Sequence, residues 1–177
     1  PQLSQAVHAN RSLFAYRQVT AIDPLLTRLL IEVATFLIVY VLILIAMAWM
    51  GFEVWPQDLL ALLGASALLI LLAAGIGLIM CCAVAYWEDA SRVLAMVMTP
   101  MLFISGVFFC ATMIPQQYWY LFSWNPIFHV LELSRDAFFP TYTTPVGSWE
   151  YLGLCALVSF SVGLMLFHLN RNRFIAT

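Results

Sequence analysis

The polar side chains best placed for chemistry follow Asn125-Pro126, a pair typical of a helix N-terminus. Four of them share or border one face of the predicted helix: His129, Glu132, Asp136 and Arg135. A histidine beside carboxylates could transfer protons, as in a membrane-embedded glycosyl- or acyltransferase that acts on a lipid-linked sugar. The same groups could instead bind sugar hydroxyls or carboxylates, or form an ion pair that only holds the segment together.

An aromatic run stands just before this helix and contains Tyr118, Trp119 and Trp124. Aromatic faces stack on sugar rings, whereas tyrosine and tryptophan also form belts at membrane surfaces. Composition alone favours the belt, because such belts are routine. If the segment instead contacts a substrate on its exit path, six side chains are the candidates: Tyr118, Trp119, Trp124, His129, Glu132 and Arg135.

Sequence motifs of catalysis are absent. The chain has no GxxxxGK[ST] loop for ATP, no HExxH and no GxSxG, and its three histidines are scattered. The four cysteines have no CxxC spacing. We therefore predict no catalytic residue, no metal site and no cofactor bound by this chain. A net charge of −2 without a basic stripe also excludes binding to nucleic acid.

Four long apolar segments carry the rest of the sequence. Hydrophobic residues make up 64% of the 177 residues and charged residues 9%, far from the composition of a globular domain. Each segment is long enough to cross a hydrocarbon core of roughly 30 Å as a helix. We predict an all-α, polytopic membrane protein with spans at 27–50, 58–86, 92–111 and 149–169.

The arginines predict how these spans are oriented. Six of the seven lie on alternate connections, namely Arg11, Arg17, Arg28, Arg92, Arg171 and Arg173. Basic residues concentrate on the cytoplasmic side of membrane proteins. The N-terminal stretch, the 87–92 turn and the C-terminal tail are therefore expected in the cytoplasm. The 112–148 loop faces outward, and its apolar part, 115–139, is expected to form a re-entrant or interfacial hairpin.

Two smaller predictions concern packing. Small residues at helical spacing, Ala73, Gly77 and Cys81 with Gly75 beside them, would let another helix approach the second span, and Ser159 and Gly163 would do the same on the fourth. Glu32 follows Arg28 by one turn, so the two side chains are expected to pair.

Ahead of the first span, a short polar segment carries Phe14, Tyr16 and Arg17. Aromatic groups beside a basic one suit docking onto a partner protein on the cytoplasmic side. The alternative is a helix that lies on the membrane surface with its arginine facing lipid headgroups.

Three runs of sequence carry a family resemblance: SLFAYRQVTAIDPLLTRLLIE, RVLAMVMTPMLFISGVFF and IPQQYWYLFSWNPIFHVLELSRDAFFP. Together they resemble the inner-membrane permease subunit of ABC-2 type exporters of capsular polysaccharide, the group 2 capsule family. The similarity covers essentially all of 1–177, and the outer-loop run is its most specific part. Relatives that export O-antigen or teichoic acid share the plan, and ABC-2 exporters of lipids or drugs are a further alternative.

The resemblance implies a single transmembrane domain of six helices that works as a homodimer with two copies of a separate ATPase, which would bind ATP and Mg. It implies that 5–21 is the cytoplasmic coupling helix, so that Phe14, Tyr16 and Arg17 contact the ATPase, and that 115–139 forms re-entrant outer helices. Further implied partners are a periplasmic adaptor, an outer-membrane export channel, membrane lipid and the polysaccharide or glycolipid. Only four spans are predicted here, so we expect the first two spans of the family plan to lie outside this chain.

Overall fold

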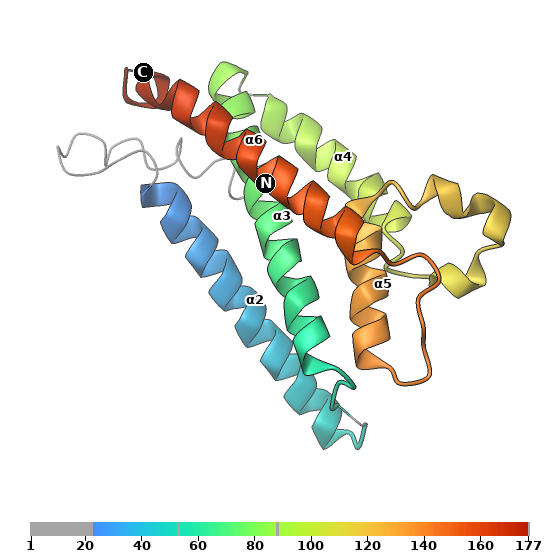
Figure 1. Cartoon of the computed structure of the whole chain (residues 1–177). Helices are drawn as coiled ribbons and strands as arrows, with labels where there is room; N and C mark the ends of the chain where they lie inside the picture. Colours follow the sequence, from blue (N-terminus) through green and yellow to red (C-terminus); the bar gives the residue numbers. More distant parts are fainter. Residues whose placement is uncertain (1–22, 53, 88, 177) are drawn as a thin grey trace.

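The computed structural model describes residues 23–52, 54–87 and 89–176, and every regular element in those ranges is a helix (Figure 1). The long helices are α2 (Asp23–Trp49), α3 (Leu59–Tyr86), α4 (Ala90–Ile104) and α6 (Trp149–Ala176). Between α4 and α6 lie two short 3-10 helices, η3 (Ala111–Met113) and η4 (Gln116–Leu121), and the helix α5 (Pro126–Phe138). The predicted all-α class is confirmed for the described residues.

Three of these helices are long and apolar enough to cross a membrane: Leu25–Trp49, Leu59–Tyr86 and Trp149–Asn170. They coincide with three of the four predicted spans. The helix in the fourth predicted span, 92–111, is shorter than predicted, because α4 ends at Ile104 after 15 residues. Its length of about 22 Å is short of a hydrocarbon core of roughly 30 Å. The chain leaves the helix at Ser105 and turns at Gly106, whose φ is +75°.

The core of the molecule is the contact between α3 and α6, which run side by side. Their backbones approach closely at two glycines. A Cβ built on Gly75 would lie 2.5 Å from the backbone nitrogen of Phe160, and one built on Gly163 would lie 2.8 Å from the Gly75 carbonyl oxygen. The predicted small-residue stripe is thus right in kind but misplaced on α3, since Ala73 is exposed and Gly75 makes the contact.

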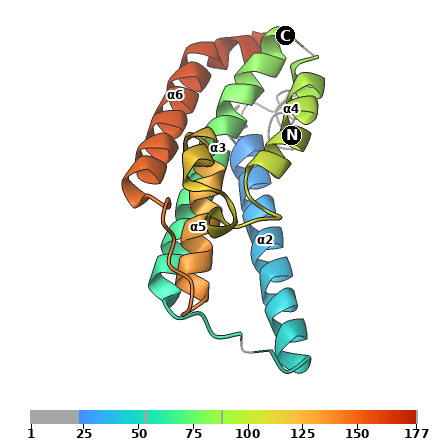
Figure 2. The same ribbon diagram turned by 90° about the vertical axis from the view of Figure 1, so that its right-hand side faces the viewer.

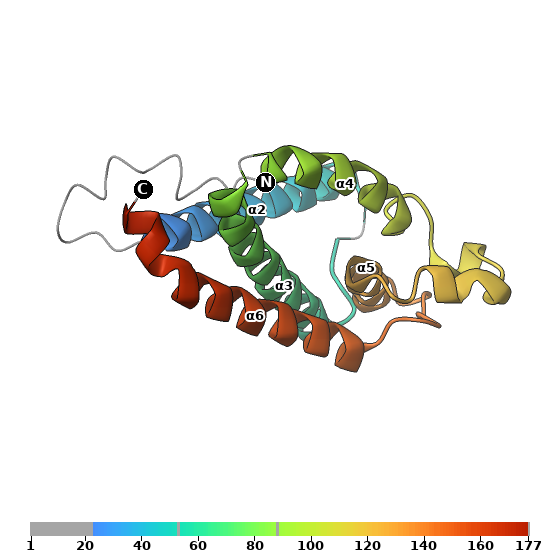
Figure 3. The same ribbon diagram turned by 90° about the horizontal axis from the view of Figure 1, so that it is seen from above.

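Viewed from above, α3 lies between α6 on one side and α2 and α4 on the other (Figure 3). Turned by 90° about the vertical, the molecule shows α5 against the lower half of α3 (Figure 2). The helix α2 is anchored near its start, where Leu25 packs with Leu78 and Phe167. Its later apolar side chains are mostly exposed, as expected of a surface that faces lipid or another helix.

Polar contacts join the helices at both ends of the bundle. At one end lie the start of α2, the end of α3, the start of α4 and the end of α6 (Figure 1). There the Tyr86 hydroxyl donates to the Asn170 side chain, and Arg28 pairs with Glu32 at 3.1 Å as predicted. At the other end the Asp58 backbone N–H donates to the Ala137 carbonyl at 3.0 Å, which joins α3 to α5. The side of the membrane that each end faces stays a prediction.

Candidate functional site

The candidate site is the loop between α4 and α6, and its framework begins at the N-terminus of α5. The fully buried Asn125 caps α5 as predicted, because its Oδ1 accepts from the Ile127 N–H at 3.0 Å. Its Nδ2 donates to the Ser105 hydroxyl at 3.2 Å, and that hydroxyl donates to the Met101 carbonyl. One side chain therefore fixes the start of α5 against the end of α4.

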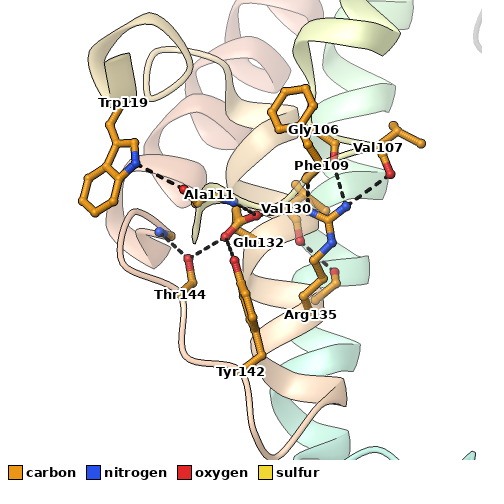
Figure 4. A network of polar contacts seen from close by, with 12 residues as sticks. Gly106, Val107, Phe109, Ala111, Trp119, Val130, Glu132, Arg135, Tyr142 and Thr144 are labelled. Atoms are coloured by element: carbon orange, nitrogen blue, oxygen red, sulfur yellow. Dashed lines mark hydrogen bonds and ion pairs between the residues drawn. The ribbon is translucent and has the colours of Figure 1, made fainter. Parts of the chain in front are cut away.

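Glu132 is the centre of a polar network, and its own side chain is fully buried, with an exposed fraction of 0% (Figure 4). Its Oε1 accepts from the Ala111 N–H at 3.1 Å and from Arg135 Nη1 at 3.0 Å. Its Oε2 accepts from the hydroxyls of Tyr142 and Thr144. Four donors fill the lone-pair sites of a carboxylate. As folded, Glu132 has no acceptor site left for a substrate.

Arg135 donates its terminal N–H groups to the same loop. Besides Glu132, Nη1 donates to the Phe109 carbonyl at 3.0 Å, and Nη2 donates to the carbonyls of Gly106 at 2.5 Å and Val107 at 3.3 Å. The guanidinium thus gathers three carbonyl oxygens from the turn that follows α4 (Figure 4). Arginine suits this task because its planar fork presents several donors in fixed directions.

Tyr142 and Thr144 bring a third segment into the network, the chain between α5 and α6. Burial raises the pKa of Tyr142 above its ordinary 10.0, and the hydrogen bond to Glu132 and its charge raise that pKa further. The phenol therefore stays protonated and remains a donor to the carboxylate. Thr144 also accepts from the Gly147 N–H at 2.9 Å, and its own N–H donates to Asp136 at 3.1 Å.

His129 is buried between two backbone groups. Its Nε2 lies 2.7 Å from the Ser123 carbonyl oxygen, and its Nδ1 accepts from the Ser148 N–H at 3.1 Å. A carbonyl can only accept and a backbone N–H can only donate, so these partners define the neutral tautomer with the proton on Nε2. The ring also packs against Tyr151 at a centroid distance of 4.8 Å. Both ring nitrogens are engaged, and neither is open to a reacting group.

The aromatic side chains of the loop divide into two sets. The indole N–H of Trp119 is directed at the carbonyls of Ala111 and Ile114, at 3.2 and 3.0 Å, and holds η3 to η4. Tyr118 and Trp124 remain open, with exposed fractions of 47% and 55%. Of the aromatic candidates predicted from sequence, these two are therefore the ones whose rings are available to another molecule.

The predicted site residues are thus partly brought together. The structure joins His129, Glu132 and Arg135 through α5, leaves Tyr118 and Trp124 at the surface, and gives Trp119 a place in the framework. Phe14, Tyr16 and Arg17 lie outside the described residues. Sequence reasoning missed Tyr142 and Thr144, which follow Pro140 in a segment without periodicity, so no pattern could have placed them.

Chemically, this arrangement can hold a loop in place and offer aromatic faces. Among the described residues, no group of three or more His, Cys, Asp or Glu side chains could hold a metal ion. The transferase alternative uses Glu132, His129 and Asp136 as acid and base. Glu132 and His129 are saturated by groups of the chain itself, and Asp136 accepts from the Thr144 N–H.

Comparison with known proteins gives consistent matches. The family model for ABC-2 type transporters matches residues 11–139. The chain is 38% identical over 163 residues to the polysialic acid transport protein KpsM of Escherichia coli, covering 92% of this chain and 63% of the relative. It is 32% identical over 159 residues to the capsule polysaccharide export inner-membrane protein CtrC of Neisseria meningitidis serogroup A, covering 90% and 60%.

A third relative is the capsule polysaccharide export inner-membrane protein BexB of Haemophilus influenzae, at 28% identity over 161 residues, with 91% of this chain and 61% of the relative covered. The chain therefore spans roughly three-fifths of the length of these relatives. The family model covers the candidate site up to residue 139, so Tyr142 and Thr144 lie beyond the matched residues.

Proposed function

The chain belongs to the family of ABC-2 type transporters, and from this premise we propose that it is part of the permease subunit of an ATP-driven exporter of capsular polysaccharide in the bacterial inner membrane. The proposal rests mainly on the activity for which the relatives are named. All three are named for transport or export of a polysaccharide, and each aligns over nine-tenths of this chain. Three helices of suitable length and composition support the membrane location.

In this proposal the chain crosses the membrane four times. The segment 90–111 provides the crossing that α4 alone is too short to make, because the extended turn after Ile104 adds to its length. The segment 115–139, with η4 and α5, is the re-entrant or interfacial hairpin on the outer side. Residues 93–131 contain no Asp, Glu, Lys or Arg, which supports placing α4 and the first part of the hairpin, 115–131, at the membrane.

Energy would come from a separate ATPase, present in two copies and carrying ATP and Mg. Closure of the ATPase dimer would act on the coupling helix at 5–21 through Phe14, Tyr16 and Arg17, and would move the spans between discrete arrangements. A second copy of the permease would complete the path. On the outer side a periplasmic adaptor and an outer-membrane channel would take over the polymer.

The outer aromatic rings are the proposed contact with the polysaccharide. Stacking on a sugar ring tolerates translation better than directed hydrogen bonds do, so exposed rings suit a polymer that must slide. Tyr118 and Trp124 are exposed and can serve this purpose directly. Trp119, His129, Glu132 and Arg135 would act on the path by holding the loop, since their polar atoms are occupied within the chain.

The test is affinity purification of the intact membrane protein in mild detergent, followed by identification of what copurifies. We expect a stoichiometric ATP-binding subunit that is lost when Tyr16→Ala and Arg17→Glu are combined, with membrane insertion unchanged. The matched control is Arg92→Gln, since the Arg92 side chain is exposed and pairs only with the neighbouring Asp89 in the described structure.

Two results would overturn the proposal. One is a protein that purifies alone and turns over lipid-linked sugars without an ATPase, which would favour a transferase. The other is ATP hydrolysis in the purified complex that responds to small amphiphiles while capsule export proceeds without the protein, which would indicate an exporter of lipids or drugs.

A further inference from the structure

The break after α4 is the least expected feature of the fold. Between Arg92 and Glu132 the sequence contains no charged residue, and an uninterrupted helix would satisfy all of its backbone groups. Instead α4 stops at Ile104, Gly106 adopts a positive φ, and the chain runs without helix to Ala111. In a membrane, the free carbonyls of such a turn are costly unless protein groups satisfy them.

Two side chains of α5 supply those groups. Arg135 donates to the carbonyls of Gly106, Val107 and Phe109, and Glu132 accepts the Ala111 N–H at the far side of the turn. The two residues are also paired with each other at 3.0 Å, so the turn adds no net charge. Figure 4 shows both side chains directed at the 106–111 backbone. The ion pair thus takes the place of water along one face of the turn.

Packing reinforces the same geometry. A Cβ on Gly106 would lie 2.8 Å from the ring of the buried Phe128, and the rings of Phe109, Phe122 and Phe128 pack together. On the other side, Tyr142 and Thr144 hold Glu132 and so tie the segment before α6 to the same carboxylate. One ion pair therefore joins three segments: the end of α4, the helix α5 and the approach to α6.

We infer that Glu132 and Arg135 are positioning residues that fix a broken membrane span, holding residues 105–111 in a non-helical turn from the neighbouring helix α5. This inference rests on the proposed placement of 90–111 in the membrane. It assigns the pair a role different from binding the polysaccharide. The pair determines where the outer loop, with Tyr118 and Trp124, stands over the end of α4.

The native thiol of Cys110 lies inside the turn and reports on it, being partly buried and free. The experiment uses the full-length protein in spheroplast membranes with every other cysteine replaced, and measures the rate at which a membrane-impermeant maleimide labels Cys110 from outside. We expect Arg135→Gln and Glu132→Gln to raise this rate by about tenfold or more, as expected for loss of a charge-assisted hydrogen bond. Arg135→Lys should restore it only in part, because an ammonium has three donors at a single point.

Three variants make the test specific. Arg92→Gln removes an equal charge at the other end of α4 and should leave the rate unchanged. Gly106→Ala disturbs the turn through its positive φ and its contact with the Phe128 ring, without changing a charge, and should raise the rate. The double variant Glu132→Gln with Arg135→Gln is neutral but still leaves three carbonyls with poorer donors, so it should label as fast as the single variants.

The inference is overturned if both single variants label at the wild-type rate while Gly106→Ala labels faster, since the backbone conformation and packing at Gly106 would then fix the turn without the ion pair. It is also overturned if the double variant returns to the wild-type rate, because only charge balance would then matter. Loss of both Arg135 variants from the membrane would overturn it as well, since the pair would then support the whole fold. None of these results depends on the ATPase, so they are distinct from failure of the proposed function.

Discussion

Replacing Gly75 by alanine is expected to separate the two helices at the core of the molecule. The added Cβ would lie 2.5 Å from the Phe160 nitrogen and 2.6 Å from the Ser159 carbonyl carbon. Because ordinary carbon contacts are about 3.5–4.0 Å, α3 and α6 must move apart by roughly 1 Å. Both clashing atoms belong to backbone, so no side chain can rotate away to relieve the contact.

The size of the effect follows from two opposing terms. Overpacking of this kind costs about 1–3 kcal/mol, and the upper value applies where backbone meets backbone. Alanine in place of glycine favours a helix by about 1 kcal/mol. The expected net loss is about 2 kcal/mol of unfolding free energy. Gly153→Ala on α6 is the matched control, because nothing lies within 4 Å of its added Cβ and only the gain of about 1 kcal/mol remains.

The assay is the midpoint of thermal unfolding of the intact protein in mild detergent, followed by loss of the monodisperse species. At about 2–4 °C per kcal/mol, Gly75→Ala should lower the midpoint by roughly 4–8 °C and Gly153→Ala should raise it by about 2–4 °C. Adding Gly163→Ala to Gly75→Ala should cost less than the sum of the two single changes, because the helices are already apart. Equal midpoints for the Gly75 and Gly153 variants would refute the close approach of α3 and α6.

Three further outcomes are expected. Asn125→Ala should lower stability by about 1–2 kcal/mol, measured by the same assay. Asn125→Asp should not restore it, because the carboxylate keeps the cap but is buried and cannot donate to Ser105. Tyr142→Phe should be less stable than wild type at neutral pH, and this difference in stability should shrink above pH 10. The reason is that a group whose pKa is raised on folding contributes stability below its unfolded pKa and loses that contribution as the pH rises. A difference in stability that widens above pH 10 would contradict the hydrogen bond between Tyr142 and Glu132. Tyr118→Ala and Trp124→Ala should reduce polysaccharide export in a capsule assay without a shift in thermal midpoint. Met113→Ala changes a more exposed, non-aromatic side chain of the same loop and should leave export intact. Equal export by all three variants would mean that the aromatic rings form only a membrane belt.

The helices themselves were predictable because their determinants are local. Apolar length defined α2, α3 and α6, the Asn125-Pro126 pair defined the start of α5, and the spacing of Arg28 and Glu32 defined their ion pair. The face of α5 that carries His129 and Glu132 also followed from helical periodicity. Each of these features depends on residues within one or two turns of each other, and a linear pattern contains that information.

What only the tertiary structure decided depends on contacts between distant segments. Hydrophobicity continues past Ile104, so the sequence predicted a span to 111. The turn becomes visible only in the fold, where Arg135 satisfies its carbonyls from 26–29 residues away in sequence. In the same way Gly75 rather than Ala73 faces α6, and Tyr142 and Thr144 complete the bonding of Glu132. The residue type shows that the Glu132 carboxylate can accept four hydrogen bonds. Only the fold determines which donors surround it, and that no acceptor site is left for a substrate.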